Sequence, residues 1–324
     1  MVNAIRAHQY GGPEVMKWEA IDVGAPGQGE VRVKNTACGL NFVDVYQRTG
    51  LYKQPTLPFV LGNEAAGVVT AVGAGVTELK AGDRIAYVGP VGSYCEERLI
   101  PADRLVKVPD GIDDKTAAAM MLKGMTARYL LRQTYKVAQG NVILLHAAAG
   151  GVGLIASQWA RHLGATVIGT VGSDDKVALA KQHGCHHVIN MRTEDWVKKV
   201  KEITNGAGCD VAYDSIGKDT YPGSLDCLKP FGLWASFGNA SGAITNFDLG
   251  ILAGKGSLYA TRPTLNTYTA KRADLVENAN DLFDVVKKGA VKITINQTYA
   301  LKDAAQAHAD LEGRKTTGQT VLTV

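Results

Sequence analysis

The stretch of sequence that decides the fold is Val142–Leu163, VILLHAAAGGVGLIASQWARHL. It begins with four apolar residues, which is typical of a short buried strand, and continues through a glycine-rich turn at His146–Gly153. It ends in apolar residues at helical spacing. In such a strand–turn–helix unit, backbone N–H groups and the positive end of the helix face a phosphate. We therefore predict a nucleotide site, with a nicotinamide dinucleotide as the favoured ligand.

The turn departs from the G-x-G-x-x-G pattern at one position. Ala148 stands where the first glycine is usual, whereas Gly150 and Gly153 hold the second and third positions. Glycine turns of this kind also occur where nothing binds. The prediction therefore depends on the segments around the turn.

From about Asp113 onward, strand-like and helix-like segments alternate along the chain. This alternation predicts an α/β fold with a parallel, doubly wound sheet of the Rossmann type. The predicted strands are 142–147, 166–171, 187–190, 210–215, 233–237 and 258–261. The predicted helices are 113–122, 151–163, 174–183, 194–204 and 219–228, with a longer one at 268–288.

Residues 1–124 have the composition and turn signals of a β-rich domain, with short strands that suggest an irregular barrel or sandwich. The tail Ile293–Val324 returns to a strand, a helix and a strand. It is too short to form a domain by itself, so we expect it to complete the first domain. The predicted organisation is a β-rich domain at 1–124, a dinucleotide-binding domain at 125–264 and a C-terminal return at 265–324.

Composition argues against several classes of protein. The 35 basic and 31 acidic residues leave a net charge of +4, and no basic run is interleaved with aromatic residues, so no nucleic-acid partner is indicated. No apolar segment reaches the roughly 18 residues that cross a bilayer. The segment MVNAIRAHQYGG lacks the apolar core of a secretion signal, so we expect a cytoplasmic protein without a membrane partner. Five widely spaced cysteines predict buried free thiols, not disulfides.

The end of the second predicted strand indicates which dinucleotide binds. An NAD enzyme usually carries Asp or Glu there to accept a hydrogen bond from the ribose 2′-hydroxyl, but this chain has Val171. The space beside Gly172, the hydroxyl of Ser173 and the cation of Lys176 suit a 2′-phosphate better. Arg192, just after the third predicted strand, offers a second cation. We therefore predict NADPH as the cofactor.

Two carboxylates in the same region oppose this prediction mildly. Asp174 and Asp175 would repel a phosphate if they faced it. Alternatively, they cap the next helix, whose first turn they occupy.

Eight segments, in order along the chain, carry a resemblance to a known family. They are GLNFVD (39–44), LGNEAAG (61–67), AGDR (81–84), LKGMT (122–126), HAAAGGVG (146–153), DSIG (214–217), SFGNASG (236–242) and RKTTG (314–318). Over its whole length the chain resembles the zeta-crystallin-like NADPH:quinone oxidoreductases, a zinc-free branch of the medium-chain dehydrogenases/reductases. The resemblance implies a GroES-like catalytic domain, a Rossmann domain that binds NADPH, and a homodimer.

Zinc dehydrogenases share this architecture, so the metal-ligand positions are compared directly. The resemblance places their ligand cysteine at Asn41 and their ligand histidine at Asn63. Their third ligand falls near Lys123–Thr126, where no thiol exists. Amides and an ammonium group do not replace soft ligands, so we predict no metal.

The resemblance and the residue types together give a set of candidate site residues. Asn41 can offer an amide N–H to an acceptor oxygen, and Tyr46 and Tyr52 can stack on a ring or donate a proton; alternatively, both tyrosines are surface residues. Lys123 can reach a phosphate or ribose, or is a lysine at a helix end. Glu64 is expected to be a paired structural carboxylate. The predicted catalytic residues are Asn41, Tyr46 and Tyr52. The predicted cofactor-binding residues are Phe42, Val43, Asp44, Lys123, Tyr129, Gly150, Gly151, Val152, Gly153, Gly172, Ser173, Lys176, Arg192, Ser215, Ile216, Gly238, Asn239, Ser241 and Arg314.

Three functions are compatible with these residues. The first is NADPH-dependent reduction of quinones to the semiquinone or hydroquinone, because quinones accept electrons without strong electrophilic help. The second is reduction of the double bond of an alkenal or enone. The third is a dinucleotide-binding protein with an RNA-binding role, which no basic stripe supports.

Overall fold

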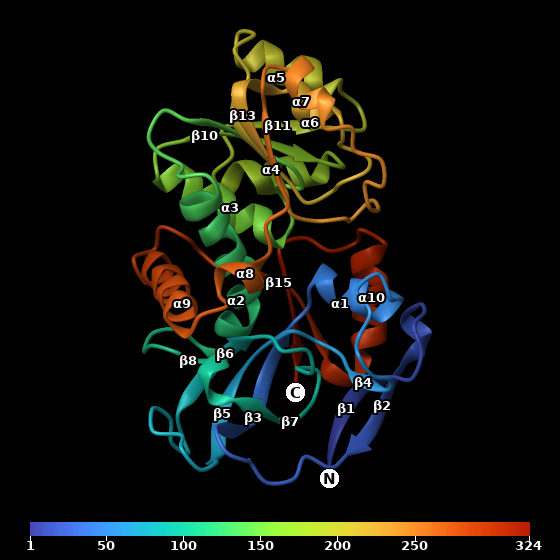
Figure 1. Ribbon diagram of the computed structural model, residues 1–324, viewed down its shortest axis with the longest axis vertical. Helices are drawn as coiled ribbons and strands as arrows, with labels where there is room; N and C mark the ends of the chain where they lie inside the picture. The colour runs from blue at the N-terminus through green and yellow to red at the C-terminus, as the bar shows by residue number, and fades with distance from the viewer. The chain divides into compact units, whose positions relative to one another are not determined.

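The computed structural model describes residues 1–324, which divide into two compact units (Figure 1). The first unit consists of Met1–Lys123, Lys271–Phe283 and Ile293–Val324. The second consists of Gly124–Ala270 and Asp284–Lys292. The predicted boundaries placed all of 265–324 with the first domain. The structure groups Leu265–Ala270 and Asp284–Lys292 with the second unit instead.

The first unit contains two sheets. A three-stranded sheet has the order β2 (Met16–Ile21), β1 (Val2–Ala7) and β4 (Phe59–Val60). A seven-stranded sheet has the order β15-β16-β3-β5-β6-β8, and β7 also pairs with β3. Its strands are β3 (Glu30–Gly39), β5 (Glu64–Val72), β6 (Arg84–Val88), β7 (Glu97–Pro101), β8 (Leu105–Lys107), β15 (Ile295–Ala300) and β16 (Gln319–Thr323).

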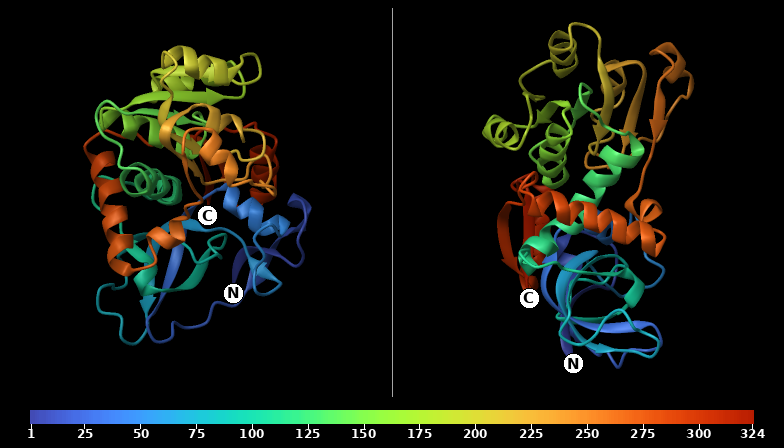
Figure 2. Two further views of the ribbon diagram at one scale, coloured as in Figure 1. Left: turned by 45° about the horizontal axis from the view of Figure 1, so that its top comes forward. Right: turned by 90° about the vertical axis from the view of Figure 1, so that its left-hand side faces the viewer.

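The alternation seen in the sequence explains the central strand β3. Val31 and Val33 are fully buried, and the residues between and beside them are partly exposed. One face of β3 therefore joins the apolar core of this unit, together with Ile85 of β6 and Leu322 of β16. The right-hand view of Figure 2 shows the red C-terminal strands beside the blue N-terminal ones. The antiparallel pairing of β16 with β3, Val321 opposite Gly39, confirms the predicted return of the tail.

Helices of the first unit follow its strands. They include α1 (Phe42–Thr49) and α10 (Ala304–Glu312). Two longer helices, α2 (Asp114–Tyr129) and α9 (Arg272–Lys287), each contain residues of both units. The 3₁₀ turns are Pro13–Val15, Ala102–Arg104 and Leu301–Asp303, and a π-helical segment, Leu130–Thr134, follows α2.

The second unit is a six-stranded parallel sheet with the order β11-β10-β9-β12-β13-β14. Numbered from β9, this is the 3-2-1-4-5-6 order of the Rossmann fold, so the predicted α/β fold class is confirmed. The strands are β9 (Val142–Leu145), β10 (Thr166–Val171), β11 (His187–Asn190), β12 (Cys209–Asp214), β13 (Leu228–Ser236) and β14 (Tyr259–Thr261). The helices are α3 (Gly151–His162), α4 (Asp175–Gln182), α5 (Trp196–Ile203), α6 (Gly223–Asp226), α7 (Gly250–Gly254) and α8 (Leu265–Tyr268).

Three predicted helices differ in extent. The predicted helix 219–228 is wrong in length: α6 is a single turn, because Pro222 precedes it and β13 already begins at Leu228. The predicted helix 113–122 continues to Tyr129, because no residue after Leu122 breaks it. The predicted helix 268–288 begins later, as α9 at Arg272, because Tyr268 is the last residue of the separate helical turn α8.

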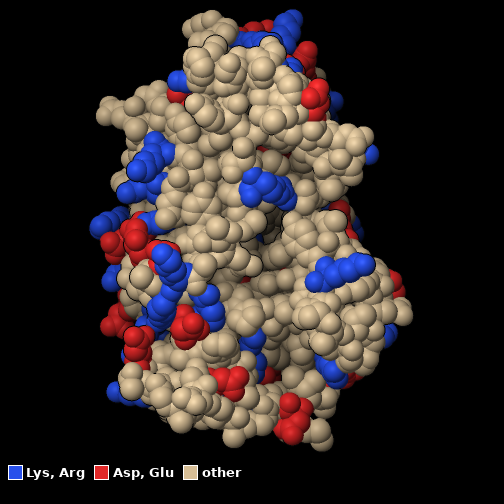
Figure 3. Space-filling model, in the orientation of Figure 1, with Lys and Arg blue, Asp and Glu red and all other residues tan.

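The distribution of surface charge does not indicate a particular binding partner. Basic and acidic side chains are interspersed over much of the face drawn in Figure 3. None of the helices combines the length and the apolar composition needed to cross a bilayer. All five cysteines are free and buried, as predicted.

Candidate active site

Helix α1 presents a polar face to the interior of the first unit. Asn41 has an extended backbone and caps the helix, and the Asp44 carboxylate accepts the Asn41 backbone N–H at 2.8 Å. Asp44, Gln47 and Arg48 are all buried. Arg48 pairs with Glu312 of α10 at 2.8 Å and lies 3.2 Å from Nδ1 of His308. Because these charged groups are paired, the helix can bury them.

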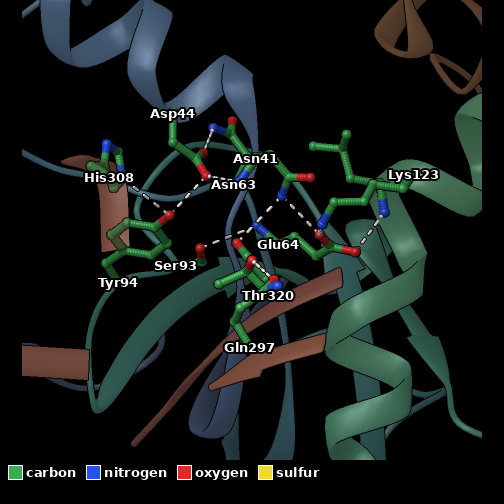
Figure 4. A network of polar contacts seen from close by, with 12 residues as sticks. Asn41, Asp44, Asn63, Glu64, Ser93, Tyr94, Lys123, Gln297, His308 and Thr320 are labelled. Atoms are coloured by element: carbon green, nitrogen blue, oxygen red, sulfur yellow. Dashed lines mark hydrogen bonds and ion pairs between the residues drawn. The ribbon is translucent and has the colours of Figure 1, made fainter. Parts of the chain in front are cut away.

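Asp44 is the centre of this polar face. Its carboxylate also accepts a hydrogen bond from Asn63 Nδ2 at 2.6 Å and one from the Tyr94 hydroxyl at 2.8 Å (Figure 4). Burial raises the pKa of Asp44 to about 6, although these hydrogen bonds act in the opposite direction. The whole of Asp44, backbone included, has no exposed surface, and its contact with a cofactor stays a prediction.

A second carboxylate, Glu64 at the start of β5, lies beside Asn41 and Lys123 (Figure 4). It is fully buried and accepts hydrogen bonds from Leu122 N at 2.7 Å and from Asn41 Nδ2 at 2.8 Å. Lys123 Nζ is 3.9 Å from the same oxygen that Asn41 contacts. Burial raises the pKa of Glu64 and lowers that of Lys123, and their mutual attraction opposes both shifts. Glu64 is thus paired, as expected, and its structural role stays a prediction.

Two buried polar atoms beside Glu64 have no hydrogen-bond partner. They are Asn41 Oδ1 and Lys123 Nζ. Both N–H groups of the Asn41 amide donate within the protein, to Glu64 and to the Gly39 carbonyl, so its donation to a substrate oxygen stays a prediction. Its carbonyl oxygen is the unsatisfied atom. Lys123 does not lie at a helix end, as one interpretation had it, but within α2.

The three positions compared with zinc ligands occupy one region of the first unit. Asn63 contacts Asp44, whereas Asn41 and Lys123 contact Glu64. Two amides and an ammonium group lack the soft, deprotonated donors that zinc requires. No group of three or more His, Cys, Asp or Glu side chains in the structure could hold a metal ion.

An aromatic cluster follows Asn41 along α1. The rings of Phe42 and Tyr46 are 6.2 Å apart, and those of Tyr46 and Tyr52 are 5.3 Å apart and edge to face. Tyr52 is 41% exposed, and Phe42, Val43 and Tyr46 are partly exposed. The structure thus brings these predicted residues together on one segment.

In the second unit, the glycine turn follows β9 and leads into α3. Gly150 is the N-cap, and no side chain caps the helix. A Cβ on Gly153 would lie 2.7 Å from Ala148 Cα and closer still to the Ala147 carbonyl oxygen, so only glycine fits there. The structure also explains Ala148, whose Cβ packs against Gly169 of β10. Gly150, Gly151, Val152 and Gly153 therefore form a backbone cradle suited to a phosphate.

A buried network that sequence reasoning missed supports this turn. His146, which precedes the turn, lies 2.9 Å from Thr170 Oγ1 and 3.0 Å from Ser224 Oγ. The Ser224 hydroxyl is 2.9 Å from Asp214, whose carboxylate also accepts the N–H groups of Ile216 and Gly217. The sequence places His146 and Asp214 at the ends of predicted strands, so both could have been identified as site residues. No motif around Ser224 indicated that it belongs to this network.

Two further loops meet at the same edge of the sheet. Ala240 N donates to Ser215 O, and Ser241 N donates to Ile216 O. The Ser241 hydroxyl joins the loops, because it donates to Ile216 O and accepts from Asp219 N. Gly238 is required, since a Cβ there would meet the Ser215 backbone. Asn239 lies in the same loop and is partly exposed.

Arg262 is a second residue that sequence reasoning missed. Its guanidinium donates to the carbonyl oxygens of Ser236 and Gly238 at 2.9 and 2.8 Å. It therefore fixes the loop that follows β13. It also donates to the Ser236 hydroxyl at 3.1 Å, and no motif in the sequence marked it.

The ends of β10 and β11 carry the residues predicted to select NADPH. Val171 and Asn190 are register partners, so Ser173, Lys176 and Arg192 emerge at one edge. Asp174 does not cap α4 with its side chain; it accepts a hydrogen bond from Asn190 Nδ2 at 2.8 Å. The Ser173 hydroxyl bonds the Asp175 carboxylate and lowers its pKa. Both acids are thus engaged locally. Gly172 is exposed and has open space around it.

Two further predicted cofactor residues belong to other segments of the chain. Tyr129 is buried in the second unit, and its ring stacks on that of Tyr268 at 4.5 Å. Arg314 belongs to the first unit and is exposed, with a left-handed backbone (φ 59°) after α10.

Comparison with known proteins places this geometry in a family. Residues 27–110 match the alcohol dehydrogenase GroES-like domain, and residues 151–282 match the zinc-binding dehydrogenase family. A quinone oxidoreductase from Pseudomonas aeruginosa is 53% identical over 323 residues, which cover 99% of each chain. The chain belongs to the quinone oxidoreductase family. The predicted resemblance is thereby confirmed.

Other members of the quinone oxidoreductase family and its neighbours extend the comparison. The crystal structure of the Escherichia coli quinone oxidoreductase complexed with NADPH has a TM-score of 0.98 and 48% identity, and covers 99% of this chain and all of the other. A 2-haloacrylate reductase from a Burkholderia species is 49% identical over 332 residues, covering 99% of each chain. The chain is therefore an oxidoreductase of this family with a GroES-like and a dinucleotide-binding domain.

Proposed function

We propose that the chain catalyses the NADPH-dependent reduction of quinones to the semiquinone or hydroquinone without a metal ion. The observation that carries the proposal is its full-length similarity to a quinone oxidoreductase that was crystallised with NADPH. The glycine turn at Gly150–Gly153 fits the dinucleotide phosphates, because it leads into the N-terminus of α3, which has no side-chain cap. When bound, NADPH supplies the hydride.

In this proposal the chain's own residues divide between the two units. Lys176 and Arg192 bind the 2′-phosphate, and the loops at Ser215–Gly217 and Gly238–Gly242 line the path of the cofactor. The aromatic cluster of Phe42, Tyr46 and Tyr52 provides flat apolar surface for a quinone ring. Either tyrosine hydroxyl is suited to donate a proton to the reduced oxygen.

The experiment that tests the proposal is a turnover screen of the purified protein with NADPH against quinones, enals and enones. We expect quinone-dependent oxidation of NADPH. No turnover with any of the three classes would remove this function and the alternative below.

The cofactor preference is tested with Lys176→Ala. We expect about a tenfold loss of NADPH affinity and little change for NADH, since a hydrogen bond to a charged group contributes roughly 1.5–3 kcal/mol. Fluorescence titration measures both, with Lys181→Ala on the same helix as the matched control. An equal loss for both cofactors would contradict the assignment.

A second candidate is reduction of an activated carbon–carbon double bond, with hydride added to the β-carbon. It is favoured by the 49% identity to a 2-haloacrylate reductase. Product analysis separates the two: a saturated carbonyl product supports double-bond reduction, and a radical signal or hydroquinone supports the first proposal.

We further propose a cytoplasmic homodimer. Five free thiols are typical of a reducing compartment. The sheet of the second unit ends in β14, an edge strand with Tyr259 62% exposed, and Phe231, bonded through its backbone to Gly256 just before β14, is 68% exposed. Such an unpaired apolar edge suits pairing with a second copy of the chain. Light scattering of the wild type and of Tyr259→Lys tests this: we expect a dimer that the substitution weakens. A monomeric wild type would overturn it.

A further inference from the structure

The ammonium group of Lys123 is buried without a hydrogen bond. The residue is 7% exposed, and Nζ has no hydrogen-bond partner in the structure. Its nearest charged group is the Glu64 carboxylate, 3.9 Å away, which is too far for a hydrogen bond. A buried donor left unpaired is destabilising, and more so when it is charged. An arrangement of this kind indicates that a ligand completes the site.

The structure points to a neutral acceptor oxygen as that ligand. Two buried carboxylates, Glu64 and Asp44, act electrostatically on the single ammonium. A phosphate or carboxylate ligand would bring a further negative charge into this buried region, at a high cost in desolvation and repulsion. An uncharged carbonyl oxygen brings only lone pairs.

We propose that Lys123 donates a hydrogen bond to the carbonyl oxygen of the substrate, at the place where zinc relatives hold their metal. This assignment replaces the contact with a cofactor phosphate or ribose expected from the sequence, and it rests on the proposed function. Glu64 positions the Lys123 ammonium through its carboxylate oxygen Oε2, which lies 3.9 Å from Nζ and also accepts the hydrogen bond from Asn41 Nδ2.

The chemistry balances without another reactant. NADPH would deliver a hydride, two electrons and one proton, to one carbonyl oxygen of the quinone; both carbonyl π bonds are then replaced by one ring C=C bond, and negative charge develops on the other oxygen. Lys123 stabilises that charge and keeps its proton. The oxygen then takes a proton from the hydroxyl of Tyr46 or Tyr52, which water reprotonates, and this gives the hydroquinone and NADP⁺. A donor aimed at such a developing charge contributes roughly 100-fold to the rate.

The test compares the wild type with Lys123→Met and with Lys302→Met, an exposed control on the first unit. The carbonyl stretch of isotope-labelled 1,4-benzoquinone bound in the presence of NADP⁺ is measured by infrared difference spectroscopy. We expect a lowered frequency in the wild type and in Lys302→Met. In Lys123→Met the frequency should return toward that of a quinone without a charged donor. Circular dichroism confirms that each variant is folded, and Lys123→Arg, which keeps the charge, should restore part of the shift if Lys123→Met does not fold.

Turnover and cofactor binding complete the test. We expect kcat/KM with 1,4-benzoquinone to fall roughly 100-fold in Lys123→Met while NADPH affinity stays within twofold. The proposal is overturned if the carbonyl frequency is the same in Lys123→Met as in the wild type. It is also overturned if the wild type does not lower the frequency. A loss of NADPH affinity above tenfold with unchanged frequency overturns it too, and returns Lys123 to the cofactor. If the frequency is lowered but the wild type turns over no quinone, the contact stands and the proposed function fails.

Discussion

At the scale of single residues, two buried ionisable groups in one network respond to acid in opposite ways. Asp44 has a raised pKa, so the folded state binds its proton more tightly than the unfolded state. His308 has a lowered pKa, so its folded state binds a proton less tightly than the unfolded state. Burial is the larger cause and the charge of Arg48 the second, and together they lower the pKa to about 3. The Tyr94 hydroxyl lies between them, 2.8 Å from Asp44 and 3.4 Å from His308 Nε2. Protonation of Asp44 therefore favours the folded state and protonation of His308 opposes it, at the two ends of one hydrogen-bonded network.

His308 should make the first unit sensitive to acid. Its contribution is fully present above the unfolded pKa of about 6.5 and is lost as pH falls toward 3, because only the unfolded state takes up the proton. The slope is about 1.4 kcal/mol per pH unit at most. In His308→Gln this slope should vanish, as measured by denaturant unfolding between pH 7 and pH 4. Identical slopes in the two proteins would contradict the prediction.

Glu64 should set the alkaline limit of activity through Lys123. Burial lowers the pKa of the Lys123 ammonium, and Glu64 raises it. In Glu64→Gln that support is lost, so the alkaline fall in kcat/KM should move to lower pH. The matched comparison is Glu97→Gln, which removes a carboxylate paired with Arg32 elsewhere in the unit. If the alkaline fall in kcat/KM occurs at the same pH in Glu64→Gln as in the wild type, Lys123 does not take part in the reaction.

Some of the candidate site was predictable from residue types, and some was not. Asn41 and Asn63, at the positions of zinc ligands, indicated from the sequence alone that the reaction does not use zinc. The donor state of the Asn41 amide was not predictable, because it depends on Glu64, 23 positions along the chain. Arg262 and Ser224 were missed for the same reason, since their partners come from other strands and loops.

At the scale of elements, the glycine turn before α3 tolerates substitution unequally. Gly153→Ala places a methyl group against backbone atoms that cannot move independently, whereas a Cβ at Gly150 meets only the Ala147 carbonyl, at 3.1 Å. We expect Gly153→Ala to cost about 1–3 kcal/mol in stability and to weaken NADPH binding. Gly150→Ala is the matched control and should cost less. Thermal melts and NADPH titration measure both effects. Equal losses would show that the close approach does not matter.

The elements themselves were largely predictable where the pattern was periodic. All six strands of the Rossmann sheet lie where the apolar runs predicted them. The helix predicted at 219–228 was wrong, because a proline and an early strand outweigh its composition. The end of α2 was also missed, since Gly124 within it resembles a helix stop but is buried and tolerated.

At the scale of the whole molecule, the first unit is assembled from segments distant in sequence. Leu322 of β16 is fully buried in its core and pairs with Cys38 of β3. Leu322→Ala should lower the stability of this unit by about 2–5 kcal/mol, because it leaves a cavity in the core. Denaturant unfolding measures the loss, with Thr323→Ala, at a partly exposed neighbouring position, as the control. A loss no greater than that of the control would contradict a core role for the tail.

The pairing of β16 with β3 also has a consequence for biosynthesis. On the ribosome, β3 emerges early, but its partner is translated only after nearly all of the second unit. The Rossmann sheet is therefore complete while the first unit still lacks a strand, so the nascent chain should acquire its dinucleotide-binding fold before its barrel closes. Protease digestion of nascent chains arrested near Lys292 would reveal this order: Gly124–Ala270 should resist cleavage while the N-terminal segment is still cut.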